Sequence, residues 1–153
     1  MLLSTLTIEM TGVGSHSAFA ASSDFAAGGG KYVAGAEEIE FSFAARSGPL
    51  GEDPSGFIFL QEKGHFLLQA DVFCLSVSGN LATLAGRITR NEGAFNQPGF
   101  EELVLKVNDN NKGLGVPDKA AHIVTAQGLG QADCYPETVV PPVVHGNIVV
   151  HDA

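Results

Sequence analysis

Residues 66–90 read FLLQADVFCLSVSGNLATLAGRITR, and this stretch decides the fold. It is rich in Val, Leu, Ile, Phe and Thr, and it is broken once, at Gly79-Asn80. Gly and Asn tolerate the positive φ angles of a two-residue hairpin turn, so two β-type runs around this pair predict a β-hairpin. The many β-branched residues make a helix unfavourable in the same stretch. The sequence therefore indicates a compact β domain.

Alternation of apolar and polar residues predicts further strands. From Glu38 to Ala45, the side chains of Ile39, Phe41 and Phe43 share one face, as in a half-buried antiparallel strand. The predicted strands are residues 38–45, 57–61, 66–78, 81–90, 103–107, 121–126 and 143–151. The residues predicted to form the core are Leu68, Val72, Cys74, Leu84 and Ile88, with Phe41, Phe43, Leu105 and Val107 facing them.

Segments rich in turn-forming residues separate these strands, and no segment keeps a helical period. The fold class predicted from this pattern is all-β, with a single antiparallel β-sandwich or small β-barrel of about seven to eight strands.

The N-terminal region has the composition of a leader. Met1-Leu-Leu begins an apolar run, and residues 17–21 (SAFAA) have the small-x-small pattern of a signal cleavage site. Glu9 interrupts the apolar run, and no Lys or Arg precedes it. We expect residues 1–27 to be a leader or signal-like segment and residues 28–153 to be a single β domain. Nowhere does the apolar run reach the roughly 18 residues of a spanning helix, so we expect no transmembrane segment.

The charge balance excludes two classes of partner. The 153 residues contain 8 Lys and Arg against 17 Asp and Glu, giving a net charge of −9. Nucleic-acid-binding proteins carry basic stripes, and binding to anionic lipid also requires basic clusters. Neither nucleic acid nor an anionic membrane surface is therefore an expected partner.

The polar loop at residues 108–118 is the best candidate for an ion site. It offers Asp109, Asn111 and Asp118 among several glycines. Oxygen ligands in a glycine-rich loop suit Ca²⁺, which takes about six to eight oxygens. The spacing does not match an EF-hand, and the same residue types form ordinary tight turns. Calcium at this loop is the one cofactor that the residues suggest.

Other chemistry has weaker support in the residues. The five histidines show no metal-ligand spacing, and His145 and His151 would lie roughly 20 Å apart on one strand. No GxSxG motif is present. Glu38 and Glu40 fall together on the polar face of a predicted strand, which favours a solvated surface over an acid–base pair. No catalytic residue is therefore assigned.

The two cysteines, Cys74 and Cys134, lie outside any CxxC motif. An even count fits one disulfide in an oxidising compartment, and a pair of buried free thiols fits equally well. The residues alone leave both alternatives open.

Several motifs in order resemble a family of small secreted bacterial β domains. They are GGG (28–30), EFSFAAR (40–46), VFCLSVSGNLATLAGRITR (72–90), VNDNNKG (107–113) and HGNIVVHDA (145–153). That family shares a glycine-rich start, a CLxVxGNxAxxxGxxT hairpin, a VxDN loop and a GNxxVHD ending. The likeness covers most of the chain from Gly28 onward, and the hairpin is its most specific part.

The resemblance implies export and a β fold, and it favours a Cys74–Cys134 bridge. It implies no biochemical activity. The chain departs from the family in LQEKGHF (60–66), which lacks the paired histidines of some members, and in DNNKG (109–113), where an acidic residue is common. Both departures weaken any metal role that the family would suggest at these places.

The function expected from the sequence is that of a non-enzymatic exported β domain, secreted or extracellular, which binds a partner or serves as a structural element. The expected partner is an extracellular protein or a small molecule. The alternative is a small-ligand-binding or enzymatic β-barrel with an internal cavity, since barrels of about eight strands can hold one small ligand.

Overall fold

The computed structural model describes residues 22–110, 116–139 and 141–153, and these form one curled sheet of eight antiparallel strands. This confirms the all-β prediction. The strands are β1 (Asp24–Ala34), β2 (Glu37–Ser47), β3 (Ser55–Glu62), β4 (Phe66–Ser78), β5 (Leu81–Gly93), β6 (Glu102–Asn108), β7 (Lys119–Thr125) and β8 (Val143–His151). One short helix, α1 (Leu129–Ala132), lies between β7 and β8.

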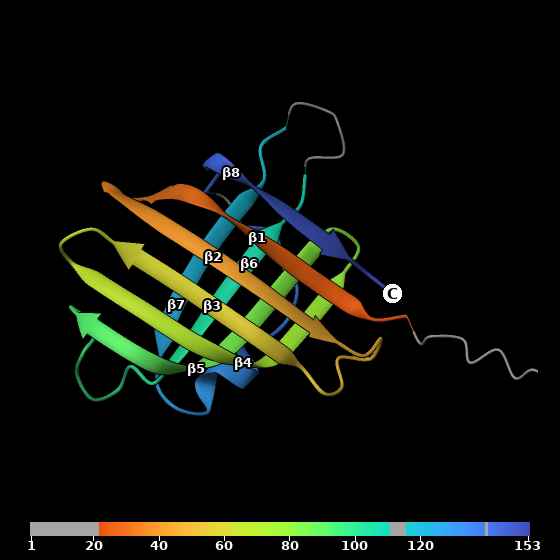
Figure 1. Ribbon diagram of the computed structural model, residues 1–153, viewed down its shortest axis with the longest axis horizontal. Coiled ribbons are helices and arrows are strands. Elements are labelled where there is room, and N and C mark those ends of the chain that lie inside the picture. Colours follow the sequence, from red (N-terminus) through yellow and green to blue (C-terminus); the bar gives the residue numbers. More distant parts are fainter. Residues whose placement is uncertain (1–21, 111–115, 140) are drawn as a thin grey trace, which may run out of the picture.

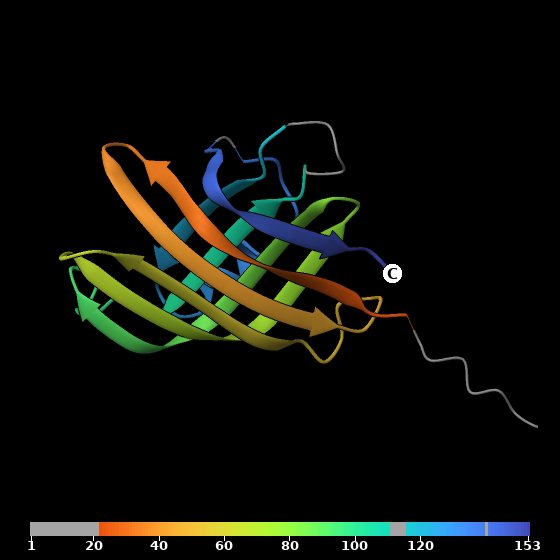
Figure 2. The same ribbon diagram turned by 45° about the horizontal axis from the view of Figure 1, so that its top comes forward.

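The strands follow one another across the sheet in the order β7-β6-β5-β4-β3-β2-β1-β8, so only β8 departs from a simple meander. The sheet curls until β1, β2 and β3 cross in front of β6 and β7 (Figures 1 and 2). Its two edge strands approach each other at one corner. There Lys119 bridges to Pro142, and the Val143 N–H donates to the Asp118 carbonyl at 2.7 Å.

The 66–90 hairpin forms as predicted, with Ser78 opposite Leu81 across the Gly79-Asn80 turn. Its register shifts between Val72 and Cys74, where Phe73 is an extra residue that forms a β-bulge.

The bulge reverses which side chains face inward. Before it, Leu68 and Val72 are buried, whereas after it Leu75 is buried and Cys74 is only partly covered. The predicted core position of Cys74 is therefore wrong, because the expected alternation does not include the extra residue.

Apolar side chains fill the space enclosed by the curled sheet. Apart from Cys74 and Ile88, the predicted core residues are confirmed as buried. Ile88 is partly buried and packs against the core. The largest fully buried side chains are Tyr32, Phe41, Phe43, Ile39, Ile58, Leu60, Leu68, Leu75, Leu84, Leu103, Leu105 and Ile148. The core thus draws on strands from every part of the sheet.

The glycine triplet lies inside strand β1, which the sequence patterns did not predict as a strand. β1 begins at Asp24, four positions before the expected domain start at Gly28. Gly30 pairs with Gly146 of β8, and a Cβ atom on Gly30 would stand 2.0 Å from the His145 carbonyl oxygen. Glycine is needed here because the two backbones approach too closely for a side chain.

Leu68→Ala tests the packing of the enclosed core. Leu68 is fully buried, so we expect its truncation to lower the free energy of unfolding by about 2–5 kcal/mol. The neighbouring Leu67 points the other way and is half-buried, so Leu67→Ala is the matched control, with an expected loss of about 1 kcal/mol or less. Urea denaturation of both variants measures the difference, and equal losses would contradict the assignment of the inner face.

Candidate functional site

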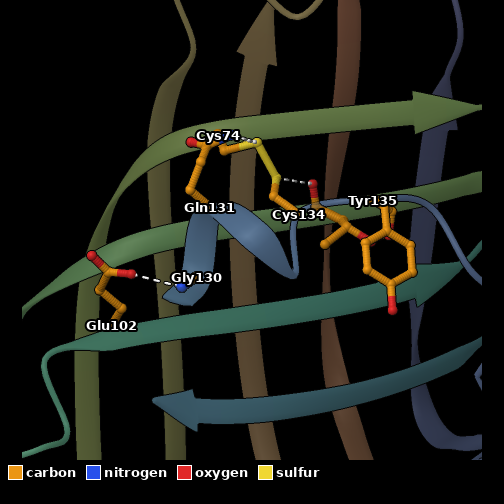
Figure 3. The surroundings of a disulfide bond; sticks show 7 residues. Cys74, Glu102, Gly130, Gln131, Cys134 and Tyr135 are labelled. Carbon is orange, nitrogen blue, oxygen red and sulfur yellow. Dashed lines mark hydrogen bonds between the residues drawn. A yellow bond between two sulfur atoms is a disulfide. The ribbon is translucent and has the colours of Figure 1, made fainter. Parts of the chain in front are cut away.

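Strand β6 is buried on both faces. Its inner face supplies Leu103, Leu105 and Val107 to the core. Its outer face carries Glu102, Lys106 and Asn108, three polar residues that are each 3% exposed. Residues 126–139, which we call the covering segment, lie over this outer face and include α1 (Figure 3).

Each outward polar side chain of β6 has a partner in the covering segment. The Glu102 carboxylate accepts the N–H groups of Gly128 and Gly130 at 2.9 and 2.8 Å. The Asn108 Oδ1 accepts the Val139 N–H at 3.1 Å. These bonds compensate for the removal of the polar groups from water.

Lys106 is held by both charge and an aromatic ring. Its Nζ lies 2.5 Å from Glu137 Oε1 and 4.0 Å from the centre of the Tyr135 ring. On β5, the Thr83 hydroxyl donates to the Tyr135 carbonyl at 2.7 Å. The covering segment is therefore attached to two neighbouring strands.

Cys74 and Cys134 form a disulfide that joins β4 to the covering segment (Figure 3). This confirms the predicted bridge. The bridge depends on the bulge at Phe73, which turns Cys74 away from the core and toward the outer face.

The two described aspartates of the predicted calcium loop accept hydrogen bonds from backbone amides. Asp118 accepts from the N–H groups of Asn110 and Ile148 at 2.9 and 2.8 Å, and Asp109 accepts from Val150 at 3.1 Å. Asp109 directly follows β6 and Asp118 directly precedes β7, so both aspartates connect this end of the two strands to β8. Asn111, the third predicted ligand, lies outside the described residues, and calcium at this loop stays a prediction.

A second group of ionisable side chains gathers where β2 begins and β3 ends. Glu37, Glu62 and His65 place one ligand atom each so that all three atoms lie within 4.8 Å of one another. Glu62 is almost fully buried, and its Oε1 is 2.8 Å from His65 Nδ1. Glu37 and His65 are exposed. The group combines two carboxylates and an imidazole, which are ligands for a divalent metal ion.

The electrostatics of this group are unfavourable for two ionised carboxylates. Burial and the negative charge of Glu37 raise the pKa of the Glu62 carboxyl, while the positive charge that His65 can carry lowers it. Neither carboxylate forms an ion pair with Lys or Arg within the described residues. A cation or a shared proton would relieve the repulsion.

Sequence reasoning did not find this group. Glu37 and Glu62 are 25 positions apart and come together only through the pairing of the strands. A local signal did exist, since Glu62 and His65 flank the Lys63-Gly64 turn. The absence of the family's paired histidines weakened the expectation of a metal site at residues 60–66, which is where Glu62 and His65 lie.

The buried Tyr32 forms a pair with the partly buried His122, and the charge of Glu37 acts on this histidine. The Tyr32 hydroxyl on β1 is 2.5 Å from His122 Nδ1 on β7. Burial raises the pKa of the Tyr32 hydroxyl, so this group donates and the His122 nitrogen accepts. Burial also lowers the pKa of His122, and the charge of Glu37 partly opposes this effect. The folded protein therefore favours a neutral His122.

These features define an all-β fold with one disulfide among its described residues. No helix within the described ranges has the length and hydropathy needed to span a membrane. No family model matches the chain, and comparisons with curated proteins and with solved structures also give no match. The resemblance to small secreted bacterial β domains stays a prediction.

Stability should depend on pH through His122. Because folding lowers the pKa of His122 below its ordinary 6.5, the unfolded chain binds a proton more readily as the pH falls through that value. We expect the free energy of unfolding to fall between about pH 7.5 and about pH 5.5, by at most about 1.4 kcal/mol per pH unit.

His122→Asn is the matched comparison, because the Asn side-chain oxygen can still accept from Tyr32 but does not titrate. Urea denaturation at several pH values should give a shallower dependence for this variant. The raised pKa of Glu62 makes the free energy of unfolding change with pH in the opposite direction. Both proteins contain Glu62, so its contribution cancels when the two pH curves are subtracted. Parallel pH curves would contradict the assignment of His122 as neutral in the folded protein.

Proposed function

We propose that this protein is an exported, non-enzymatic β domain that acts at the cell exterior by binding a partner or as a structural element. The observation that carries the proposal is the packing of the interior, where large apolar side chains occupy the space inside the curled sheet. A carrier of small molecules needs an enclosed cavity at this place. The filled interior favours a domain that acts through its outer surface.

The disulfide supports a location outside the reducing cytoplasm. Disulfides persist in oxidising compartments, and a structural bridge between β4 and the covering segment fits such a compartment. The signal-like N-terminal residues and the family resemblance point in the same direction.

The proposal has a direct test in the native cells. We expect the protein in the culture medium or on the cell surface, where added protease removes it from intact cells, with Cys74 and Cys134 resistant to alkylation until a reductant is added. A cytoplasmic protein that survives the same protease treatment is the control. Recovery in the cytoplasm with two alkylatable thiols would contradict the proposed location.

A second measurement separates the binding module from the ligand carrier. Amide NMR spectra of the wild-type protein should be unchanged by benzene, because the packed interior leaves it no room. Leu68→Ala is a positive control, since an apolar cavity of sufficient size can bind benzene. Saturable shifts of core amides in the wild-type protein would instead support an internal ligand site.

A further inference from the structure

We propose that Glu37, Glu62 and His65 form a binding site for a divalent transition-metal ion, with Zn²⁺ as the probe. The site lies at the end of the sheet where the β1–β2 and β3–β4 turns are found (Figure 1). It is separate from the calcium loop predicted from the sequence, and it is independent of the proposed function.

The backbone around His65 is held in place by hydrogen bonds. The His65 N–H donates to the Glu62 carbonyl at 3.0 Å, and the His65 carbonyl accepts from the Ala94 N–H at 3.0 Å. Gly64 takes a φ of 86°, which gives the turn its tight form. The backbone positions of two of the ligands are therefore fixed before any ion binds.

The distances suit a metal ion. Two ligands of a tetrahedral zinc ion, at bond lengths of about 2.1 Å, stand about 3.4 Å apart. The ligand atoms of the three side chains all lie within 4.8 Å of one another, an upper limit that is compatible with a separation of about 3.4 Å. The Glu62–His65 pair is closer, at 2.8 Å, and the exposed His65 side chain can move outward by a few tenths of an ångström.

The choice of ion follows from the ligands. Imidazole favours zinc and its neighbours among the transition metals, whereas calcium and magnesium prefer sites made of oxygen alone. Three protein ligands with an exposed side leave a position for water.

The charge of the site supplies an independent reason. Glu62 is a buried carboxylate that faces a second carboxylate, and the partner of opposite charge within the described structure is a histidine that need not be protonated. A bound cation would neutralise the two carboxylates together, which a proton does only for one of them.

Calorimetric titration of the chelator-treated full chain with ZnCl₂ at neutral pH tests the proposal. We expect one zinc ion per chain, with affinity lowered at least about tenfold in Glu62→Gln and in His65→Ala. The matched controls are Glu40→Gln and His145→Ala, which change an exposed carboxylate and an exposed histidine outside the group. They should stay within about twofold of the wild-type affinity.

Stability gives a readout that a purely structural role would not produce. Glu62→Gln keeps the size of the side chain and removes one of two carboxylates that face each other, so without metal it should unfold no more easily than the wild-type protein. The same variant should lose most of the zinc-dependent rise in melting temperature. A folded variant with weakened zinc binding therefore separates the loss of a ligand from the loss of the fold.

NMR locates the ion. Zinc should shift the His65 ring and the amides of residues 37 and 62–66, and Co²⁺ should broaden the same signals. The proposal is overturned by an absence of binding up to about millimolar zinc. Binding that both ligand variants leave unchanged, or shifts centred on His145 and His151 or on the 108–118 loop, would overturn it as well.

Discussion

The burial of β6 on both faces is the constraint on which the rest of the structure depends. A strand in a curled sheet has one face toward the core, and its outer face usually meets solvent. Here the outer face carries Glu102, Lys106 and Asn108, and all three are buried. Because burying an unpaired polar or charged group costs several kcal/mol, the covering segment can lie over this face only if it supplies a partner to each of these side chains.

The disulfide and the bulge keep the covering segment in this place. α1 has only four residues, so it has little helical stability of its own. Its attachment comes from the hydrogen bonds to Glu102 and from the bond between Cys134 and Cys74. A regular β4 without the bulge at Phe73 would point Cys74 into the core, where the bridge could not form. The one extra residue, Phe73, thus places Cys74 where it can form the disulfide that holds the covering segment.

The sequence predicted the parts of the fold that follow from local patterns. The Gly79-Asn80 turn and the alternation around Phe41 predicted strands that the structure confirms, because each signal lies within a few residues. The strand at Gly28–Gly30 was missed, since its glycines are explained by the close approach of β8, far away in sequence. Glu37 and Glu62 were missed as neighbours of His65 for the same reason. Their proximity arises from the pairing of separate strands, which no local spacing records.

Hydrogen exchange in a variant without the disulfide tests the central claim most directly. In Cys74→Ala/Cys134→Ala the covering segment should loosen. The amides of residues 128–139 and of β6 should then lose protection from exchange together. The amides that pair β1 with β2 should keep their protection. Loss of the 60-residue cross-link should also lower the free energy of unfolding by about 4 kcal/mol in the loop-entropy model. Unchanged protection of β6 in the variant would contradict the account, because β6 would then remain buried without the attachment proposed for it.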